Sequence, residues 1–186
     1  MLAKKGQISL MKIKLYIAQS LDGYIAGPNG ELDWLEEIPN PEQEDFGYTN
    51  FYDSIDLLLM GQKTYAAICS FGIDWPYQGK QTFVFSRTKA LSSSQPDCRH
   101  LNTLDAPTIA SLRQLSKKGI WLVGGGALIR EFLRLGAIDE MIISIIPRLL
   151  GEGIPLFPAT YPAVDWQMEK TETFANGIVN LHYTKI

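Results

Sequence analysis

The sequence predicts an α/β fold of three layers, in which helices flank a central mixed, mostly parallel sheet. Short apolar and β-branched runs alternate along the 186 residues with segments of helical periodicity, a pattern typical of such folds. Several runs are too continuously apolar for a sheet with one face in water, so both faces are expected to be covered. The C-terminal segment instead has the pattern of an antiparallel hairpin.

Five segments are predicted to be strands. They are short and rich in Ile, Leu, Val and Phe: Ile13–Ala18, Ile55–Met60, Gln81–Ser86, Ile120–Val123 and Glu140–Ile146. From Val164 to Ile186, two extended segments flank Asn176-Gly177, a dipeptide that favours the positive φ angles of a tight hairpin turn. The sheet is therefore expected to end with antiparallel strands.

Helices are predicted between these strands. One begins near Pro107 and is expected to include Lys117 and Lys118 at its negative end before Gly119 stops it. A later one is closed by Gly136, and its apolar residues share one face: Leu128, Ile129, Phe132, Leu133 and Leu135. Acidic residues before Phe51 suit the first turn of a further helix: Glu42, Glu44 and Asp45.

The chain is expected to form one domain, residues 12–186, behind a flexible N-terminal extension of residues 1–11. A length of 186 residues is usual for one compact domain, and no linker or internal repeat divides the sequence. Met11 leads directly into the first predicted strand, so the residues before it are expected to carry little structure.

Composition and charge argue against several kinds of partner. The formal net charge of -3, from 17 Lys and Arg against 20 Asp and Glu, offers no broad basic face for nucleic acid. The two cysteines and two histidines lack the spacing of a metal site, so no metal is expected. No apolar run is long enough to cross a bilayer and no signal peptide begins the chain, so a cytoplasmic protein without a membrane partner is expected.

Three consecutive glycines join the fourth predicted strand to the helix that follows, in the segment Val123-Gly124-Gly125-Gly126-Ala127-Leu128. Glycine has no Cβ, so the backbone can turn sharply and bring its N–H groups and the positive end of the helix close to a phosphate. The segment lacks the full spacing of the dinucleotide-binding fingerprint. From these residues alone, a pyrophosphate cradle and a simple tight turn are equally open.

Four further segments occur with this one in a fixed order: Leu15–Ala26, Met60–Tyr65, Val84–Thr88 and Leu149–Phe157. Together the five segments resemble the dihydrofolate-reductase-like superfamily over residues 12–186. Within it, the Ser-Leu-Asp-Gly-Tyr-Ile-Ala motif and the Pro-Arg-Leu-Leu-Gly-Glu-Gly run are similar to the C-terminal reductase domain of riboflavin-biosynthesis proteins. No cytidine-deaminase-like zinc motif precedes these segments, so a stand-alone relative is expected.

The resemblance implies an NADPH site. Ala18 and Ile25 would offer backbone groups to the nicotinamide carboxamide, and the loop Leu21–Ala26 would close over the ring. Ser86 and Arg87 would flank the adenine ribose. The phosphates would meet two helix starts, one at Gly61, Gln62, Lys63 and Thr64, and one at Val123, Gly124, Gly125, Gly126, Ala127 and Leu128, where Gly125 shares a cis peptide with a neighbouring glycine.

One position departs from the family pattern, which usually has Arg where this chain has Gln62. Arg recognises a ribose 2′-phosphate with a charged planar fork, and a neutral amide cannot replace that charge. Lys63 and Arg87 supply positive charge nearby. NADPH is therefore expected in preference to NADH.

The reaction implied is hydride transfer to a small heterocyclic or ribosylamino-pyrimidine substrate, as in 5-amino-6-(5-phosphoribosylamino)uracil reductase. Asp33, beside Trp34, is the candidate proton donor or substrate anchor, because an indole can desolvate a carboxyl group and favour its protonated form. A turn-capping Asp33 is the alternative. Trp34 is expected at the substrate, and Arg148 either meets an anionic group such as a ribose phosphate or is exposed to solvent.

Two other functions stay open. Folate reduction would need a carboxylate about one helical turn beyond the loop tryptophan, whereas Leu35–Pro41 has a different register and contains prolines, so Glu36, Glu37 or Asp45 would have to serve. A non-catalytic nucleotide-binding module would keep the phosphate-binding turns without the chemistry.

A homodimer is also expected. The family resemblance implies one, and the apolar run Ile142–Ile146 with Leu149 and Leu150 is more than one sheet end easily hides. A symmetric pairing of two copies would cover this surface.

Overall fold

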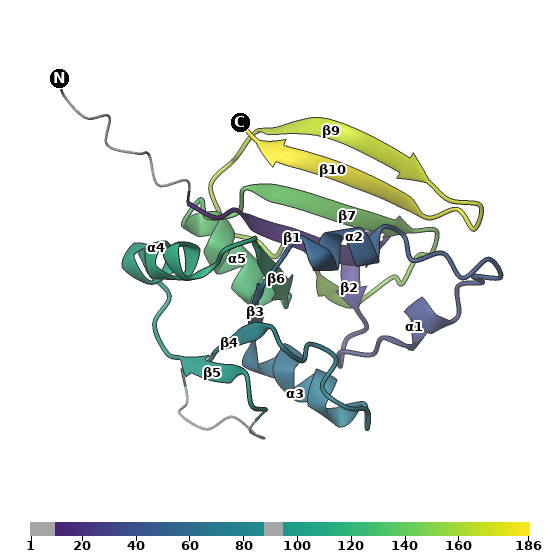
Figure 1. Ribbon diagram of the computed structural model, residues 1–186. Coiled ribbons are helices and arrows are strands. Elements are labelled where there is room, and N and C mark those ends of the chain that lie inside the picture. Colours follow the sequence, from purple (N-terminus) through teal and green to yellow (C-terminus); the bar gives the residue numbers. More distant parts are fainter. Residues whose placement is uncertain (1–9, 88–94) are drawn as a thin grey trace.

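The computed structural model describes residues 10–87 and 95–186 (Figure 1). Residues 1–9 of the expected extension therefore lie outside the described residues. Eight strands form one sheet in the spatial order β5-β4-β3-β6-β1-β7-β10-β9. In chain order they are β1 (Ile13–Ser20), β3 (Leu57–Gly61), β4 (Gln81–Phe85), β5 (Cys98–Leu101), β6 (Ile120–Gly124), β7 (Glu140–Ile146), β9 (Trp166–Thr173) and β10 (Val179–Lys185).

Helices and a small second sheet complete the described chain. The helices are α1 (Asp33–Glu36), α2 (Tyr48–Asp53), α3 (Gln62–Ser70), α4 (Ala106–Leu115) and α5 (Gly126–Arg134). The second sheet pairs β2 (Tyr24–Ala26) with β8 (Ile154–Pro155) in antiparallel fashion. None of the described helices combines the length and the apolar character needed to span a membrane.

The sheet is parallel from β5 to β7 and antiparallel beyond it. β1 lies between β6 and β7 and runs parallel to both, whereas β10 runs antiparallel to β7 and to β9. The turn between β9 and β10 contains Asn176-Gly177, with Gly177 at a φ of +85°. These features confirm the mixed, mostly parallel sheet and its C-terminal antiparallel hairpin.

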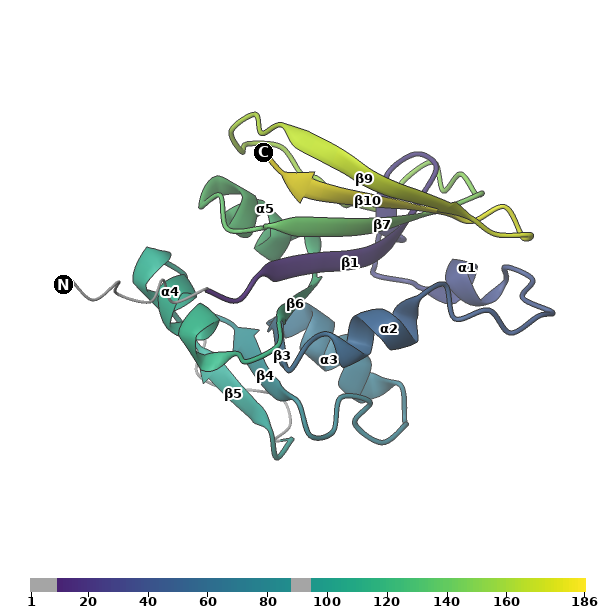
Figure 2. The ribbon, with the colours of Figure 1, turned by 45° about the horizontal axis from the view of Figure 1, so that its top comes forward.

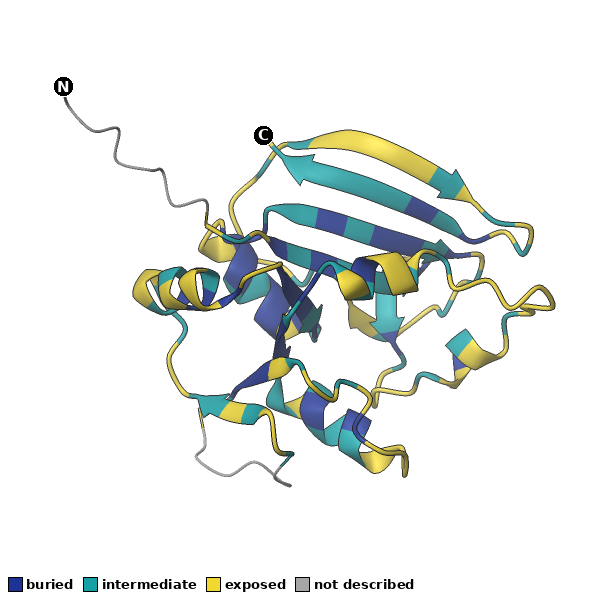
Figure 3. Ribbon diagram, in the orientation of Figure 1, coloured by how far each residue is buried: buried dark blue, intermediate teal, exposed yellow. Residues whose placement is uncertain are grey.

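Apolar residues on the two faces of the sheet form two large clusters, and a smaller third one lies beside α1. The ribbon in Figure 2 shows α4 and α5 on one side of the central strands and α2 and α3 on the other. Leu57 and Leu59 of β3 pack in a cluster with residues of α4 and α5, whereas Leu58 and Met60 pack in a cluster with residues of α2 and α3. Successive side chains of a strand point to opposite faces, which explains this division. Figure 3 shows the buried residues on the central strands, flanked by helices with exposed outer faces. The three-layer arrangement is therefore confirmed.

Two predicted helix boundaries are wrong. Helix α4 ends at Leu115, so Lys117, Lys118 and Gly119 lie beyond it. The reason is a contact that no local pattern reveals, because Asp56 accepts hydrogen bonds from the Ser116 hydroxyl at 2.6 Å and from the Lys117 N–H at 2.8 Å. Likewise α2 begins only at Tyr48, so its first turn has no acidic residue, and Asp45 instead accepts a hydrogen bond from the Thr49 N–H at 3.1 Å.

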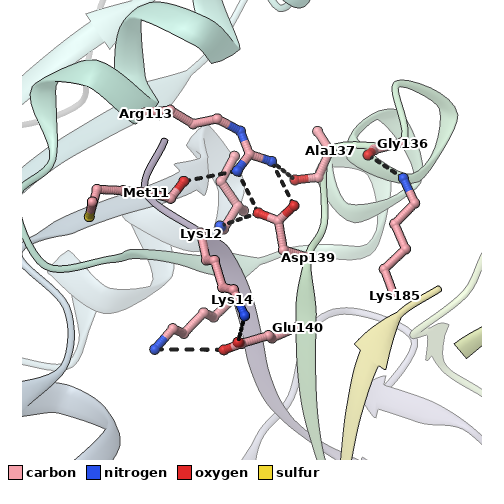
Figure 4. Close-up of polar contacts among 10 residues, drawn as sticks. Met11, Lys12, Lys14, Arg113, Gly136, Ala137, Asp139, Glu140 and Lys185 are labelled. Atoms are coloured by element: carbon pink, nitrogen blue, oxygen red, sulfur yellow. Dashed lines mark hydrogen bonds and ion pairs between the residues drawn. The ribbon is translucent and has the colours of Figure 1, made fainter. Parts of the chain in front are cut away.

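Arg113 and Asp139 join α4 to the amino ends of β1 and β7 (Figure 4). The Arg113 guanidinium contacts both Asp139 oxygens, at 2.5 and 3.0 Å, and donates to the carbonyl oxygens of Met11 and Ala137 at 2.8 and 2.9 Å. Asp139 also accepts the Ile13 N–H at 2.7 Å. This network lies at the end of the parallel strands opposite to the glycine turns described next.

Candidate functional site

Two glycine-containing turns lie side by side at the carboxyl edge of the sheet. β3 ends at Gly61 and leads directly into α3, and β6 ends at Gly124 and leads through Gly125 into α5. Since β3 and β6 are parallel neighbours, with Met60 opposite Gly124, the two helices start next to each other on opposite faces of the sheet. A Cβ added at Gly61 would lie 3.8 Å from the Gly124 carbonyl oxygen.

The second turn leaves open space where a side chain would otherwise project. The peptide between Gly124 and Gly125 is cis, as the family resemblance implies, and Gly124 has a φ of +130°. A Cβ at Gly125 would meet only the Thr64 hydroxyl oxygen at 3.4 Å. By contrast, a Cβ at Gly126 would lie 2.7 Å from the Pro155 carbonyl oxygen, which packs directly against this helix start.

The other predicted residues of this turn have different surroundings. Val123 is half-buried at the end of β6, and Ala127 is exposed on the first turn of α5. Leu128 points into the core, and its N–H donates to the Gly125 carbonyl at 2.9 Å. The first N–H groups of a helix have no intrahelical acceptor and lie at its positive end, so the starts of α3 and α5 are suited to an anion.

The residues predicted for the adenosine end lie at the start of α3 and the end of β4. The Ser86 hydroxyl donates to the Gln62 side-chain carbonyl, which links these two elements. The Ser86 N–H donates to the Leu101 carbonyl at 3.0 Å. Lys63 and Arg87 are exposed. The structure therefore brings all four predicted residues to one region, with both positive charges open to solvent.

The predicted nicotinamide loop is tied down by Asp22, a residue that the sequence analysis did not single out. Its carboxylate accepts hydrogen bonds from the Ser20 hydroxyl at 2.5 Å and from the N–H groups of Leu150 and Gly151 at 3.1 and 2.7 Å. These contacts, the Ser20 hydroxyl foremost, lower the pKa of Asp22. We call this set of contacts the Asp22 latch. In the sequence, Asp22 is marked only by the glycine that follows it, and an Asp-Gly pair is common in turns, so this role could not be predicted.

A cavity of about 450 Å³ adjoins the glycine turn. Ile17 connects the two, since it lines the cavity while its Cδ1 atom lies 3.7 Å from the Cβ position of Gly124. The lining residues come from strands, helices and loops far apart in the sequence: Tyr16, Ile17, Ala18, Leu35, Glu36, Ile38, Asn40, Phe46, Tyr48, Trp121, Ser144, Ile146, Asn176 and Ile178. Among the described residues predicted for the site, Ala18 is the one that lines this cavity.

Aromatic rings and one buried polar network shape this cavity. The rings of Tyr16 and Tyr48 are stacked with centroids 6.1 Å apart, and burial raises the pKa of both hydroxyls. The buried Ser144 hydroxyl donates to Asn180 Oδ1 at 2.7 Å, and Asn180 Nδ2 donates to the Phe46 carbonyl at 2.8 Å. This network holds the loop before α2 against β7 and β10.

The residues predicted for catalysis and substrate binding do not line the cavity themselves. Asp33 is exposed at the start of α1, and Trp34 is buried with its indole N–H unpartnered among the described residues. The Arg148 guanidinium pairs with the Glu37 carboxylate and donates to the Trp34 carbonyl at 3.3 Å. α1 instead contributes Leu35 and Glu36 to the cavity. Ile25, which belongs to the predicted nicotinamide loop Leu21–Ala26, packs against the hydrophobic core.

This sheet order, with paired helix starts at its carboxyl edge, defines a dihydrofolate-reductase-like α/β protein. The model of the RibD C-terminal domain family matches residues 11–180, so the chain belongs to that family. Membership relates the chain to the pyrimidine reductases of the riboflavin pathway, and so to the oxidoreductases. The family and the fold expected from the sequence motifs are thereby confirmed.

Similar proteins span nearly the whole chain. The uncharacterised protein YwjB of Bacillus subtilis (strain 168) is 36% identical over 174 residues, which cover 94% of this chain and 98% of YwjB. A solved structure from Shewanella sp. PV-4, of a protein named for riboflavin biosynthesis, is 34% identical with a TM-score of 0.86, covering 95% and 99% of the two chains. Dihydrofolate reductase of Enterococcus faecalis, solved with NADP(H), shares the fold at 18% identity, with a TM-score of 0.66 and coverage of 94% and 96%.

Proposed function

We propose that this protein is an NADPH-dependent reductase that transfers hydride to a small heterocyclic substrate of the type reduced in the riboflavin pathway. One observation carries the proposal: the starts of α3 and α5 lie beside a glycine turn that borders the cavity through Ile17. Anion-binding backbone next to a cavity with aromatic walls suits a dinucleotide whose reactive ring faces a flat substrate.

The residues present fit such a cofactor. Only one atom, the Thr64 hydroxyl oxygen at 3.4 Å, approaches the position of a Gly125 Cβ, so the turn leaves room for a phosphate. We assign the pyrophosphate to the N–H groups that begin α3 and α5, and the nicotinamide carboxamide to the backbone of Ala18 and Ile25. Lys63 and Arg87, both exposed, are assigned to the adenosine 2′-phosphate.

Bound NADPH would supply the hydride. The chain's own residues orient the substrate and exclude water, through the adjoining rings of Tyr16, Tyr48 and Trp121 in the cavity wall. Burial raises the pKa of the Tyr48 hydroxyl, so this group keeps its proton and serves as a hydrogen-bond donor rather than as a base. Asp33 remains our proposed proton donor or substrate anchor.

The cofactor assignment is tested by titrating the protein with NADPH and NADH while following nicotinamide fluorescence. We expect NADPH to bind more tightly, and Gln62→Arg to widen the difference by supplying the charged fork that the family pattern contains. Catalysis is tested by NADPH consumption with pyrimidine and pterin compounds. The absence of saturable binding of either nucleotide would overturn the proposal, and NADPH binding without turnover of any compound would favour a non-catalytic nucleotide-binding module.

Folate reduction is a second candidate, because Glu36 lines the cavity two residues after Trp34. A carboxylate in this position could anchor an amino-substituted ring, although the register differs from that of folate reductases. Dihydrofolate-dependent NADPH oxidation that is lost in Glu36→Gln would support this activity, and oxidation unaffected by the substitution would argue against it.

A further inference from the structure

Basic side chains are distributed unequally over the two parts of the proposed reductase site. At the cofactor end, Lys63 and Arg87 are exposed beside the start of α3 and the end of β4. Around the cavity, none of the 14 described lining residues is Lys, Arg or His. The lining contains one carboxylate, that of Glu36, which has no hydrogen bond or ion pair with any described residue. Within residues 10–87 and 95–186, exposed positive charge thus lies at the cofactor end and is lacking in the cavity lining.

Arg148 is the basic residue that β7 places just beyond the cavity, two positions after the lining residue Ile146. It is already engaged, because its guanidinium pairs with Glu37 and donates to the Trp34 carbonyl. Through these contacts, Arg148 holds helix α1 and Glu37, which directly follows it, against the end of β7. A substrate phosphate could recruit Arg148 only by displacing the Glu37 carboxylate.

The remaining lining groups favour a flat ring over an anion. Tyr16 and Tyr48 are stacked, and Trp121 meets Tyr48 edge-on with centroids 5.9 Å apart, so the cavity offers aromatic surfaces to a planar ligand. The two lining amides already have backbone partners: Asn40 exchanges hydrogen bonds with the Glu44 backbone, and Asn176 donates to the Pro39 carbonyl of another loop and accepts from the Ile178 N–H. They are therefore not arranged as a phosphate cradle.

We propose that the substrate of this protein is a flat heteroaromatic compound that carries no phosphate and is neutral or positively charged, with Glu36 selecting against anions at the cavity. This inference rests on the proposed reductase function and narrows its substrate class. The Glu36 side chain is exposed at the cavity, so its repulsion of an anion is moderate and screened by salt, and a phosphate placed there finds no basic group among the described lining residues to pair with. Arg148 would then position α1 rather than bind substrate.

A matched pair of ligands tests the proposal: 5-amino-6-(ribosylamino)uracil and its 5′-phosphate, which differ only in the phosphate. Binding of each to the full chain saturated with NADP⁺ is measured by calorimetry. We expect the phosphate-free compound to bind at least as tightly as the phosphorylated one. Tighter binding of the phosphorylated compound, by about threefold or more, would overturn the proposal.

Charge variants at Glu36 locate the selectivity. Glu36→Lys is expected to shift the affinity ratio towards the phosphorylated compound by at least about threefold, and Glu36→Gln by less, with both shifts shrinking at high salt. Glu169→Lys, which makes the same charge change as Glu36→Lys on the exposed strand β9, is the control and should leave the ratio unchanged. A ratio that is the same in wild type and in folded Glu36→Lys would remove Glu36 from the proposal.

The outcomes separate this inference from the proposed function. If NADPH does not bind, the proposed function fails before substrate is considered. If NADPH binds and the phosphorylated compound is preferred, the function stands and the substrate inference fails. If NADPH binds but neither compound does, the assignment to this heteroaromatic class is wrong, while the cofactor assignment stands.

Discussion

At the scale of single residues, the surroundings of a position decide its role more than its residue type does. Gly125 and Gly126 are adjacent and identical, yet a Cβ would meet a side-chain hydroxyl at 3.4 Å in one case and a backbone carbonyl at 2.7 Å in the other. The first contact is ordinary and the second is too close for any real structure. Gly125 is therefore available for close approach to a ligand, whereas Gly126 is required by packing against Pro155.

Replacing Gly125 by Ala is expected to lower NADPH affinity by at least about tenfold (~1.4 kcal/mol) while the fold survives, because the new methyl group would occupy the space assigned to the pyrophosphate. Fluorescence titration measures the affinity and thermal unfolding checks the fold. Gly126→Ala serves as the contrast, since it should lower the unfolding temperature as well. If a folded Gly125→Ala protein bound NADPH with wild-type affinity, the three glycines would form a tight turn without a role in binding the pyrophosphate.

Asp33→Asn is expected to lower the turnover number more than it weakens NADPH binding, because the family resemblance implies that this loop lies beside the substrate and α1 contributes Leu35 and Glu36 to the cavity. The side chain is exposed, so its removal should not change the stability of the fold measurably. Steady-state kinetics and NADPH titration on the same protein separate the two effects. An unchanged turnover number would exclude a catalytic role for Asp33 and leave it a structural role at the start of α1.

At the scale of elements, hydrogen bonds between distant segments hold the loops that enclose the site. The Asp22 latch joins the loop after β1 to the segment before β8, and Asn180 of β10 holds the Phe46 carbonyl. Phe46 has a φ of +54°, a left-handed conformation that is unfavourable for a non-glycine residue, and the contact with Asn180 helps to stabilise it. Both loops are thus positioned by tertiary contacts.

Asp22→Asn is expected to loosen the latch, since a neutral amide is a weaker acceptor than a carboxylate for the two backbone N–H groups. Faster hydrogen exchange at Leu150 and Gly151, with a several-fold weaker binding of NADPH, would be the result. The folded-state pKa of Asp22 is lowered, so its contribution is present above the ordinary carboxyl pKa and is lost only as pH falls through the lowered value. The protection factors of these amides in the wild type, which correct for the base-catalysed rise of the intrinsic exchange rate, should therefore be constant between pH 5 and 8, and a loss of protection across that range would contradict the latch.

At the scale of the whole molecule, the Arg113–Asp139 network and the candidate site lie at opposite ends of the parallel strands. The Arg113–Asp139 network joins α4 to the amino ends of β1 and β7, and the Arg113 side chain is only 13% exposed. The glycine turns and the cavity lie towards the carboxyl ends of the same sheet. Changes at one end should therefore be separable from changes at the other.

Arg113→Lys is expected to lower the free energy of unfolding by about 1–3 kcal/mol, because lysine cannot reproduce the planar fork that reaches two carboxylate oxygens and two carbonyls. Urea unfolding measures this loss, and NADPH affinity of the folded variant should stay unchanged. Arg134→Lys, which alters an exposed ion pair with Glu131, is the matched control with little expected effect. Equal stability of the two variants would show that the network adds nothing.

The oligomeric state remains a proposal. Within the run Ile142–Ile146, Ile143 and Ile146 are buried in the subunit itself, so this run provides less free surface than the sequence suggested. Leu149 is 69% exposed and is the strongest remaining structural argument for a symmetric dimer. A dimeric mass in light scattering at micromolar concentration, converted to a monomer by Leu149→Glu, is the expected result. A monomeric mass of the wild type would remove the proposal.

Local patterns in the sequence were enough for the five predicted strands, for the strand-to-helix turns and for the hairpin, but they missed the edge strand β5 and the small sheet of β2 and β8. A buried strand needs a continuous apolar run and a sharp turn needs glycine, so Glu140–Ile146 and Gly124–Gly126 are recognisable wherever they occur. The order of the five motif segments along the chain then indicated the family. Each of these features is determined by residues that are neighbours in sequence.

The cavity and the ends of some elements were decided by tertiary structure alone. Tyr16, Trp121 and Ser144 meet at the cavity only because β6, β1 and β7 are adjacent in the sheet, and helix α4 ends where Asp56, 60 residues away, binds Ser116. The same holds for Glu36, which lines the cavity, whereas Asp33, on the same short helix and equally exposed, does not. Such contacts depend on distances between segments far apart in the chain, which local propensity and periodicity do not contain.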